Sequence, residues 1–154
     1  MKIVEFLNDK AVSANLKATD KNGAIRELID ILAKAEGIRN KDEIVKTLLA
    51  RESLGSTGIG LGIGIPHGKS NAVKRLVAAF GISKKGIDFD ALDGEPVYIF
   101  FLLVAPEDSA GPHLKALARI SRLLKDKYFR DFLKQLNDEK SIYKAIKDED
   151  AKKP

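Results

Sequence analysis

The longest uninterrupted apolar run in the sequence is VYIFFLLVA, Val97–Ala105. A strand with one face in water alternates apolar and polar residues, whereas a strand buried on both faces is apolar throughout. The run suits such a strand and is far shorter than the ~20 residues that a membrane-spanning helix needs. It therefore predicts a central strand in a sheet that helices cover on both faces, which is an α/β architecture.

Patterns elsewhere in the sequence fit this architecture. Apolar residues repeat at helical spacing in the segments 21–35, 41–52, 113–124, 127–136 and 138–147. Two further strands are expected, a weakly alternating edge strand over 11–18 and an apolar strand over 76–82. Thr19 or Asp20 can cap the first helix, Gly37 ends it, and Asn40 can cap the second.

The chain is of a length that folds as one unit. It has 154 residues and no internal repeat, linker or low-complexity block. A chain of this size buries about 70% of its unfolded surface in a single core. We therefore expect one domain over 1–154, of α/β class, with a mixed β-sheet covered by helices on its faces. The segment 1–8 precedes the first element, and 149–154 is expected to form a frayed tail.

Composition excludes several classes of function. The sequence has no cysteine, which rules out disulfides and thiolate zinc sites and fits a reducing compartment. Its two histidines and dispersed carboxylates do not form a ligand set, so no metal or other cofactor is expected. The net charge is +5, but lysines and acids interleave as on solvated helix faces, which disfavours nucleic acid as a partner. The N-terminus lacks the pattern of a signal peptide, and we expect a cytoplasmic protein without membrane insertion.

The stretch GSTGIGLGIGIPHG, residues 55–68, holds six of the twelve glycines and one of the two histidines. Each glycine within a strand costs roughly 0.5 to 1 kcal/mol relative to alanine, so a compensating role is expected. If the stretch is extended, its aliphatic side chains face the core and its bare glycine face lets another backbone or a ligand approach closely. Pro66 would end the pairing, which places His67 just beyond the strand, at the edge of a shallow glycine surface with room for a bulky partner.

Two other interpretations of this stretch are open. His67 can be a structural histidine that satisfies a local hydrogen bond. The GKS at 68–70 resembles the end of a phosphate-binding loop, G-x-x-x-x-G-K-[ST]. That motif requires glycine at position 63, where the sequence has Ile63, and Pro66 removes one of the amides that would face the phosphates. Nucleotide binding is therefore disfavoured.

The glycine stretch, preceded by Arg51-Glu52 and followed by GPHL at 111–114, resembles a bacterial protein family. This is the type-2 EIIA domain of the phosphoenolpyruvate-dependent phosphotransferase system (PTS), the fructose, mannitol and nitrogen-regulatory class. The similarity in element order covers nearly the whole chain and is sharpest from Arg51 to Gly68. One position departs from the pattern, because Leu61 stands where many members carry a polar residue.

The resemblance implies a role for three side chains. His67 would accept a phosphoryl group, as a tele-phosphohistidine, from the phosphocarrier HPr or its nitrogen-branch paralogue. Arg51 would be the active-site arginine that stabilises the phosphoryl charge, and His113 would be the second active-site histidine, which supplies a supporting hydrogen bond.

General chemistry agrees with these roles. Phosphoryl transfer spreads negative charge over equatorial oxygens, so it depends on positioning and on charge compensation. The Arg51 guanidinium can offer paired donors to such oxygens, although it can also be a surface arginine that completes its helix. His113 lies near the start of a helix, where the dipole favours anions and a neutral imidazole. Alternatively, His113 is simply a residue of the helix-capping region without a role in the chemistry.

Three functions remain open from the sequence. The first is a phosphocarrier that serves a sugar permease and donates to an EIIB component. The second is a regulatory module of the nitrogen type, in which phosphorylation of His67 changes the binding of regulatory targets. The third, which the spacing and the dispersed charge disfavour, is a nucleotide- or nucleic-acid-binding domain. The GSTGIG opening leans slightly toward the nitrogen type.

Overall fold

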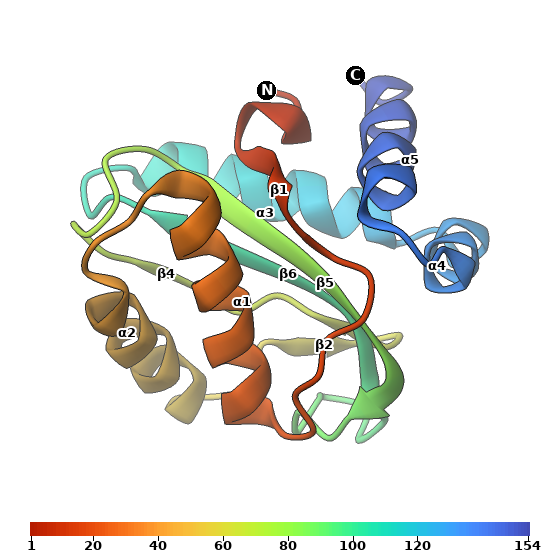
Figure 1. Ribbon diagram of the computed structural model, residues 1–154, viewed down its shortest axis with the longest axis horizontal. Coiled ribbons are helices and arrows are strands. Elements are labelled where there is room, and N and C mark those ends of the chain that lie inside the picture. Colours follow the sequence, from red (N-terminus) through yellow and green to blue (C-terminus); the bar gives the residue numbers. More distant parts are fainter.

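The computed structural model describes all 154 residues as a mixed β-sheet between two layers of helices (Figure 1). The strands run in the order β1-β5-β6-β3-β2, and β4 pairs with β6 at the end of β6 that β3 leaves free. Their bounds are β1 Leu7–Ser13, β2 Gly58–Gly60, β3 Ile63–Gly64, β4 His67–Lys69, β5 Val77–Ile87 and β6 Val97–Ala105. The α/β class and the mixed, helix-covered sheet are confirmed.

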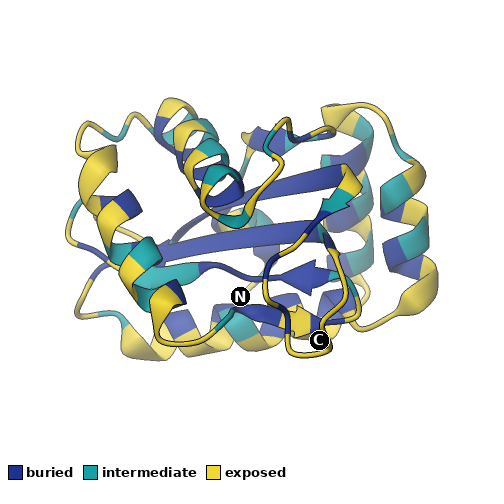
Figure 2. Cartoon of the chain, turned by 90° about the horizontal axis from the view of Figure 1, so that it is seen from below, coloured by how far each residue is buried: buried dark blue, intermediate teal, exposed yellow.

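Strand β6 is the centre of the sheet, as its apolar run predicts. It is antiparallel to β5 and parallel to β3 and β4. Every β6 residue except the half-buried Tyr98 is buried, and β5 and β6 form the buried bands across the middle of Figure 2. A strand that contributes to the core on both faces has no place for polar side chains, which explains the unbroken run.

Two separate apolar clusters lie on the two faces of the sheet. Helices α1 (Lys21–Glu36) and α2 (Lys41–Ser53) cover one face, in front of the sheet in Figure 1. The short η1 (Ile3–Glu5) and three helices cover the other face: α3 Ala110–Leu124, α4 Lys127–Gln135 and α5 Glu139–Ala151. None of these helices is both long enough and apolar enough to cross a membrane.

The ends of α1 follow the sequence signals. The side chain of Asp20, rather than Thr19, accepts a hydrogen bond from the backbone N–H of Gly23 and caps the helix. Gly37 ends it in the left-handed conformation, with φ of 70°, which glycine adopts without a steric penalty. Asn40 occupies the N-cap of α2, but its side chain donates to Glu43 instead of capping a backbone amide.

The first strand differs from its predicted position. It lies at Leu7–Ser13, whereas weak alternation predicts 11–18. After Ser13 the chain leaves the strand, and only Leu16 N–H still bonds to the sheet, at the carbonyl of Ile82. Alternation fails as a guide here because Asn8, Asp9 and Lys10 lie on the outer edge of the sheet, where polar residues are tolerated on either face.

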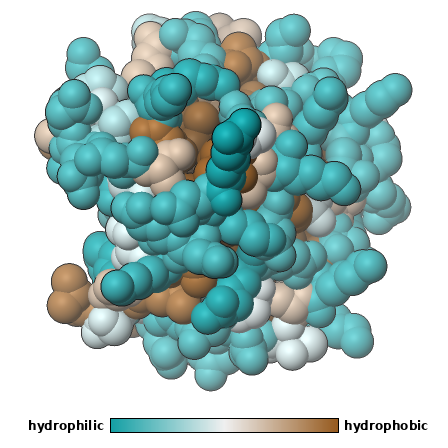
Figure 3. Space-filling model, turned by 60° about the vertical axis from the view of Figure 1, so that its left-hand side comes forward, coloured by the Kyte–Doolittle hydropathy of each residue, from teal (hydrophilic) through white to brown (hydrophobic).

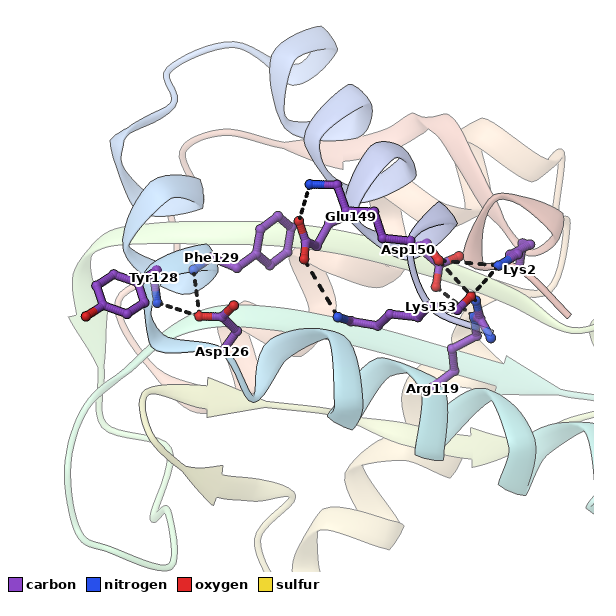
Figure 4. Close-up of polar contacts among 9 residues, drawn as sticks. Lys2, Arg119, Asp126, Tyr128, Phe129, Glu149, Asp150 and Lys153 are labelled. Carbon is purple, nitrogen blue, oxygen red and sulfur yellow. Dashed lines mark hydrogen bonds and ion pairs between the residues drawn. The ribbon is translucent and has the colours of Figure 1, made fainter.

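The C-terminal tail is held in place, which corrects the expectation that residues 149–154 fray. Helix α5 continues to Ala151, and Arg119 of α3 forms a buried ion pair with Asp150, with Nε to Oδ1 at 2.7 Å. The same guanidinium donates to the carbonyl of Lys153, and Asp150 also accepts from the backbone N–H of Ile3 at 2.7 Å. Figure 4 shows Arg119, Asp150, Lys153 and Lys2 gathered where the two termini meet α3. Polar contacts, which hydrophobic periodicity does not register, therefore fix both ends of the chain.

Candidate functional site

The glycine stretch folds as a tight hairpin, and the prediction of a single extended segment is wrong. The chain reverses between β2 and β3 at Gly60, Leu61 and Gly62, whose φ angles are 94°, 60° and 76°. Only the second arm directs its aliphatic side chain into the core: Ile63 is 1% exposed, whereas Ile59 of the first arm is 43% exposed and Leu61 at the turn is 61% exposed. Period-two alternation cannot distinguish one strand from two short ones, because the glycines that suit a strand face also suit a turn.

The glycines allow the protein to approach itself. A Cβ at Gly58 would lie 2.9 Å from the Cα of Ala91, and one at Gly68 would lie 3.0 Å from the side chain of Leu48. A Cβ at Gly64 would meet Phe100 of β6 at 3.3 Å. The expectation of close backbone approach is thus confirmed, but the open glycine surface for a bulky partner is absent, because the protein's own side chains fill that space.

His67 lies within a strand rather than beyond one. The carbonyl of Pro66 accepts from Leu103 N–H at 2.9 Å, and His67 then pairs with Leu103 in the parallel β4–β6 ladder. The prediction that Pro66 ends the pairing is wrong, since proline lacks only the donor and its carbonyl still takes part. The result is a half-buried imidazole at the carboxyl end of the central strand.

A backbone carbonyl fixes the tautomer of His67. Its Nδ1 lies 2.7 Å from the carbonyl oxygen of Ile65. Because a carbonyl only accepts, Nδ1 must carry the proton, which leaves the lone pair on Nε2. Burial lowers the pKa of His67 below its ordinary value, the bond to Ile65 opposes that shift, and the positive charge of Arg51 adds to it. Neutral His67 with a free Nε2 is therefore the dominant form at pH 7.

The second histidine lies directly against the first. His113 is in the first turns of α3, is 6% exposed, and its ring centroid lies 5.5 Å from that of His67 at an interplanar angle of 73°. Burial lowers its pKa to about 4, with further contributions from the charges of His67 and Lys69. Its Nε2 is buried and has no hydrogen-bond partner. Such an unpaired polar atom is costly in a native protein and therefore needs an explanation.

Arg51 lies in the last turn of α2, and its charge reaches His67. Its Nη1 donates to the carbonyl of Gly55 at 2.8 Å, and the guanidinium makes no other hydrogen bond or ion pair. Most of its donors are therefore free to bind an anion. The structure thus brings together all three side chains that the sequence singles out: His67 and His113 in contact, and Arg51 close enough to influence the pKa of His67.

Glu52 has a role that the sequence does not predict. It is 5% exposed and accepts from the backbone N–H and the hydroxyl of Thr57, while Lys21 of α1 forms an ion pair with it at 2.9 Å. These bonds fix the segment between α2 and β2, which includes the Gly55 carbonyl that Arg51 binds. The only signal in the sequence is an acid directly after Arg51, which does not indicate these contacts.

Leu61 lies away from the two histidines. Ile63 pairs with Ile99 and His67 with Leu103, a separation of four residues or about 13 Å along β6. Leu61 is at the turn, farther still, and its side chain points to solvent while its N–H donates to Asp93 at 3.1 Å. Apolar character at this position therefore removes no hydrogen bond from the candidate site.

The candidate site lies outside the principal surface hollows. The five principal surface hollows are lined by other residues, and none includes Arg51, His67 or His113. No group of three or more His, Asp or Glu side chains could hold a metal ion. The side of the molecule with α2 and β4, turned forward in Figure 3, is mainly hydrophilic with small groups of apolar side chains.

The GKS segment belongs to β4 and the buried Ser70 that follows it, so it forms no phosphate-binding loop.

Together these features define a class of protein: a small α/β domain that presents two neutral imidazoles and an arginine at an open edge of its sheet. The model of the family described as "Phosphoenolpyruvate-dependent sugar phosphotransferase system, EIIA 2" matches residues 5–149. The chain belongs to this family, whose members are components of a phosphotransferase system.

Relatives of known name fall in both branches of the family. A nitrogen regulatory protein of Bradyrhizobium diazoefficiens is 38% identical over 146 residues, which are 95% of each chain. The fructose-specific EIIABC component of Bacillus subtilis is 37% identical over 150 residues, which are 97% of this chain but 24% of that longer protein.

Solved structures share the fold. Nitrogen regulatory protein IIA-Ntr of Neisseria meningitidis has a TM-score of 0.85 at 30% identity, covering 92% of this chain and 97% of its own. Enzyme IIA mannitol of Escherichia coli, solved in complex with phosphorylated enzyme IIB mannitol, has a TM-score of 0.76 at 21% identity, covering 89% and 94%. At least one domain of this fold thus binds a phosphorylated EIIB component.

Proposed function

We propose that this protein is a histidine phosphocarrier that accepts a phosphoryl group on Nε2 of His67 from phospho-HPr or its nitrogen-branch paralogue. The observation that carries the proposal is the 2.7 Å contact between Nδ1 of His67 and the Ile65 carbonyl. It holds the proton on Nδ1 and leaves Nε2 as the nucleophile. The lowered pKa of His67 keeps that lone pair available at pH 7.

The transfer step needs no external acid or base. The Nε2 lone pair of neutral His67 attacks phosphorus, and the P–N bond to the donor histidine breaks with its electron pair returning to the donor nitrogen. A donor ring that is protonated on its second nitrogen leaves as neutral imidazole. The phosphorylated His67 ring then carries the positive charge, and its proton remains on Nδ1, hydrogen-bonded to the Ile65 carbonyl. Protons and charge balance across the two rings.

Arg51 and His113 compensate the charge of the phosphoryl oxygens. The free donors of Arg51 suit two oxygens at once, which an ammonium group cannot match. His113, whose pKa of about 4 keeps it neutral, can carry its proton on Nε2 and donate to a third oxygen. That donation would satisfy the one buried side-chain atom without a partner. A site outside the principal surface hollows fits a reacting group that a second protein brings, rather than a free small molecule.

Two destinations for the phosphoryl group remain, and relatives support each of them. The fructose-specific relative favours transfer to an EIIB component, whereas the nitrogen regulatory relatives favour a signal read by regulatory targets. A purified fructose-type EIIB domain distinguishes them: rapid loss of phosphate to it is expected of a transport component, and retention is expected of a regulatory one.

Phosphoenolpyruvate, the first enzyme of the pathway and HPr, incubated with the protein, provide the direct test. Intact-mass spectrometry should show the gain of one phosphate, labile in acid and stable in alkali, and phosphorus NMR should assign it to Nε2. His67→Ala should gain none, and His113→Ala should gain it more slowly. Equal phosphorylation of His67→Ala would refute the proposal.

A further inference from the structure

Lys69 lies two residues after His67 on the same strand and the same face. Successive side chains of β4 alternate, and in the parallel ladder His67 pairs with Leu103 and Lys69 with Ala105. Leu103 belongs to the apolar cluster that packs against α3, together with Ile63 and Ile65, which precede His67 at the same spacing. His67 and Lys69 therefore both face the layer that holds α3 and His113.

Lys69 is an unpaired cation on this face. It is exposed and makes no hydrogen bond or ion pair, unlike Lys21, which Glu52 holds at 2.9 Å. Its positive charge contributes to the low pKa of His113, whereas the charge of Arg51 contributes to that of His67. Arg51 comes from the last turn of α2, which covers one face of the sheet, whereas the Lys69 side chain lies on the α3 face, so the two cations approach the histidine pair from different sides.

We propose that Lys69 is a second cationic ligand of the phosphoryl group on His67, opposite Arg51. This inference rests on the proposed function, since it concerns the phosphorylated state. The phosphoryl group carries two negative charges near pH 7, and one guanidinium does not neutralise both. Lys69 has an ammonium group on a flexible stem, so it can follow the phosphoryl oxygens as a partner approaches, whereas Arg51 is tied to Gly55.

A ligand of the phosphorylated state should change how strongly the protein retains the group. Removing the charge at Lys69 should lower the equilibrium ratio of phosphorylated protein to phospho-HPr by roughly three- to tenfold, the range for a charge-assisted contact partly screened by water. Because the contact is exposed, the effect should shrink as salt rises toward 1 M, where the screening length falls to about 3 Å. A merely structural lysine would show no such salt dependence.

The experiment compares Lys69→Gln and Lys69→Arg with a matched control, Lys74→Gln. Lys74 is also exposed and unpaired and lies in the loop after β4, so its replacement removes the same charge away from His67. The equilibrium ratio is measured by mass spectrometry after incubation with phospho-HPr at 50 mM and 1 M salt. Urea unfolding confirms that each variant is folded, and NMR titration follows the pKa of His113, which should rise in Lys69→Gln.

The expected result is a lower ratio for Lys69→Gln at low salt, partial recovery in Lys69→Arg and no change in Lys74→Gln. A wild-type ratio in Lys69→Gln, with wild-type protein phosphorylated on His67, would overturn this inference and leave the proposed function intact. A wild-type protein that accepts no phosphate would overturn both. An equal loss in Lys74→Gln would also overturn it, because the effect would then be one of overall charge.

Discussion

Protonation of His113 should destabilise the fold in a defined pH range. Its pKa falls from 6.5 to about 4 on folding, because burial disfavours the imidazolium. At 1.36 kcal/mol per pKa unit, the largest possible cost is about 3.4 kcal/mol. Above pH 6.5 neither state binds the proton, so stability is unaffected. As the pH falls from 6.5 toward 4, the unfolded chain binds it first and stability is lost.

At pH 4.5 we expect His113 to lower the free energy of unfolding by about 2 kcal/mol. This is somewhat less than a full pKa shift from 6.5 to about 4 would give at that pH, because the ring borders the half-buried His67. The assay is urea unfolding at pH 7 and pH 4.5 for the wild type and His113→Gln. Carboxylates titrate in both proteins, so the difference between their pH-dependent losses isolates the imidazole. Equal losses, or an NMR titration midpoint of His113 near 6.5, would refute the reasoning.

Three substitutions test the interactions that position the site and the termini. Glu52→Gln should lower the free energy of unfolding by about 2 kcal/mol, since Lys21 loses its buried carboxylate partner and keeps only the exposed Asp90 at 3.7 Å, while Thr57 keeps a bond; urea unfolding measures it. Leu61→Gly should raise stability by about 0.5 kcal/mol by relieving a φ of 60°, which thermal unfolding would reveal. Arg119→Met leaves Asp150 buried and unpaired and should cost about 3 kcal/mol, and hydrogen exchange should show faster opening of α5. A Glu52→Gln protein as stable as the wild type, or an Arg119→Met protein with unchanged α5 exchange, would contradict the respective account.

The elements that bury apolar side chains were predictable, and those that satisfy polar groups were not. Val97–Ala105 could be predicted as the central strand because a strand that is buried on both faces is apolar at nearly every position. Helix α1 could be bounded at both ends because Asp20 and Gly37 act through local backbone geometry. The first strand was misplaced because an edge strand tolerates Asp9 and Lys10, so its pattern is weak.

At the candidate site, too, some features could be predicted from the sequence and others could not. The resemblance singled out Arg51, His67 and His113, and the structure brings them together although 46 residues separate the two histidines in the sequence. Glu52 escaped notice because its partners, Lys21 and Thr57, come from different elements, and no periodicity records a buried ion pair. The hairpin could not be predicted because a turn at Leu61 needs left-handed backbone, which the alternation of glycine with isoleucine and leucine does not distinguish from a strand.

Pro66 links the glycine hairpin to the chemistry of His67. Its carbonyl continues the ladder by accepting from Leu103, but it has no N–H, so the pairing with β6 is one-sided at this residue. The preceding carbonyl, that of Ile65, is directed to the imidazole rather than to a strand. An N–H at position 66 would belong to the same trans peptide as the Ile65 carbonyl and point the opposite way, so the carbonyl stays available to the imidazole whichever residue follows it. The Ile65 carbonyl, rather than the missing N–H of Pro66, therefore keeps the proton on Nδ1 and leaves the lone pair on Nε2 free.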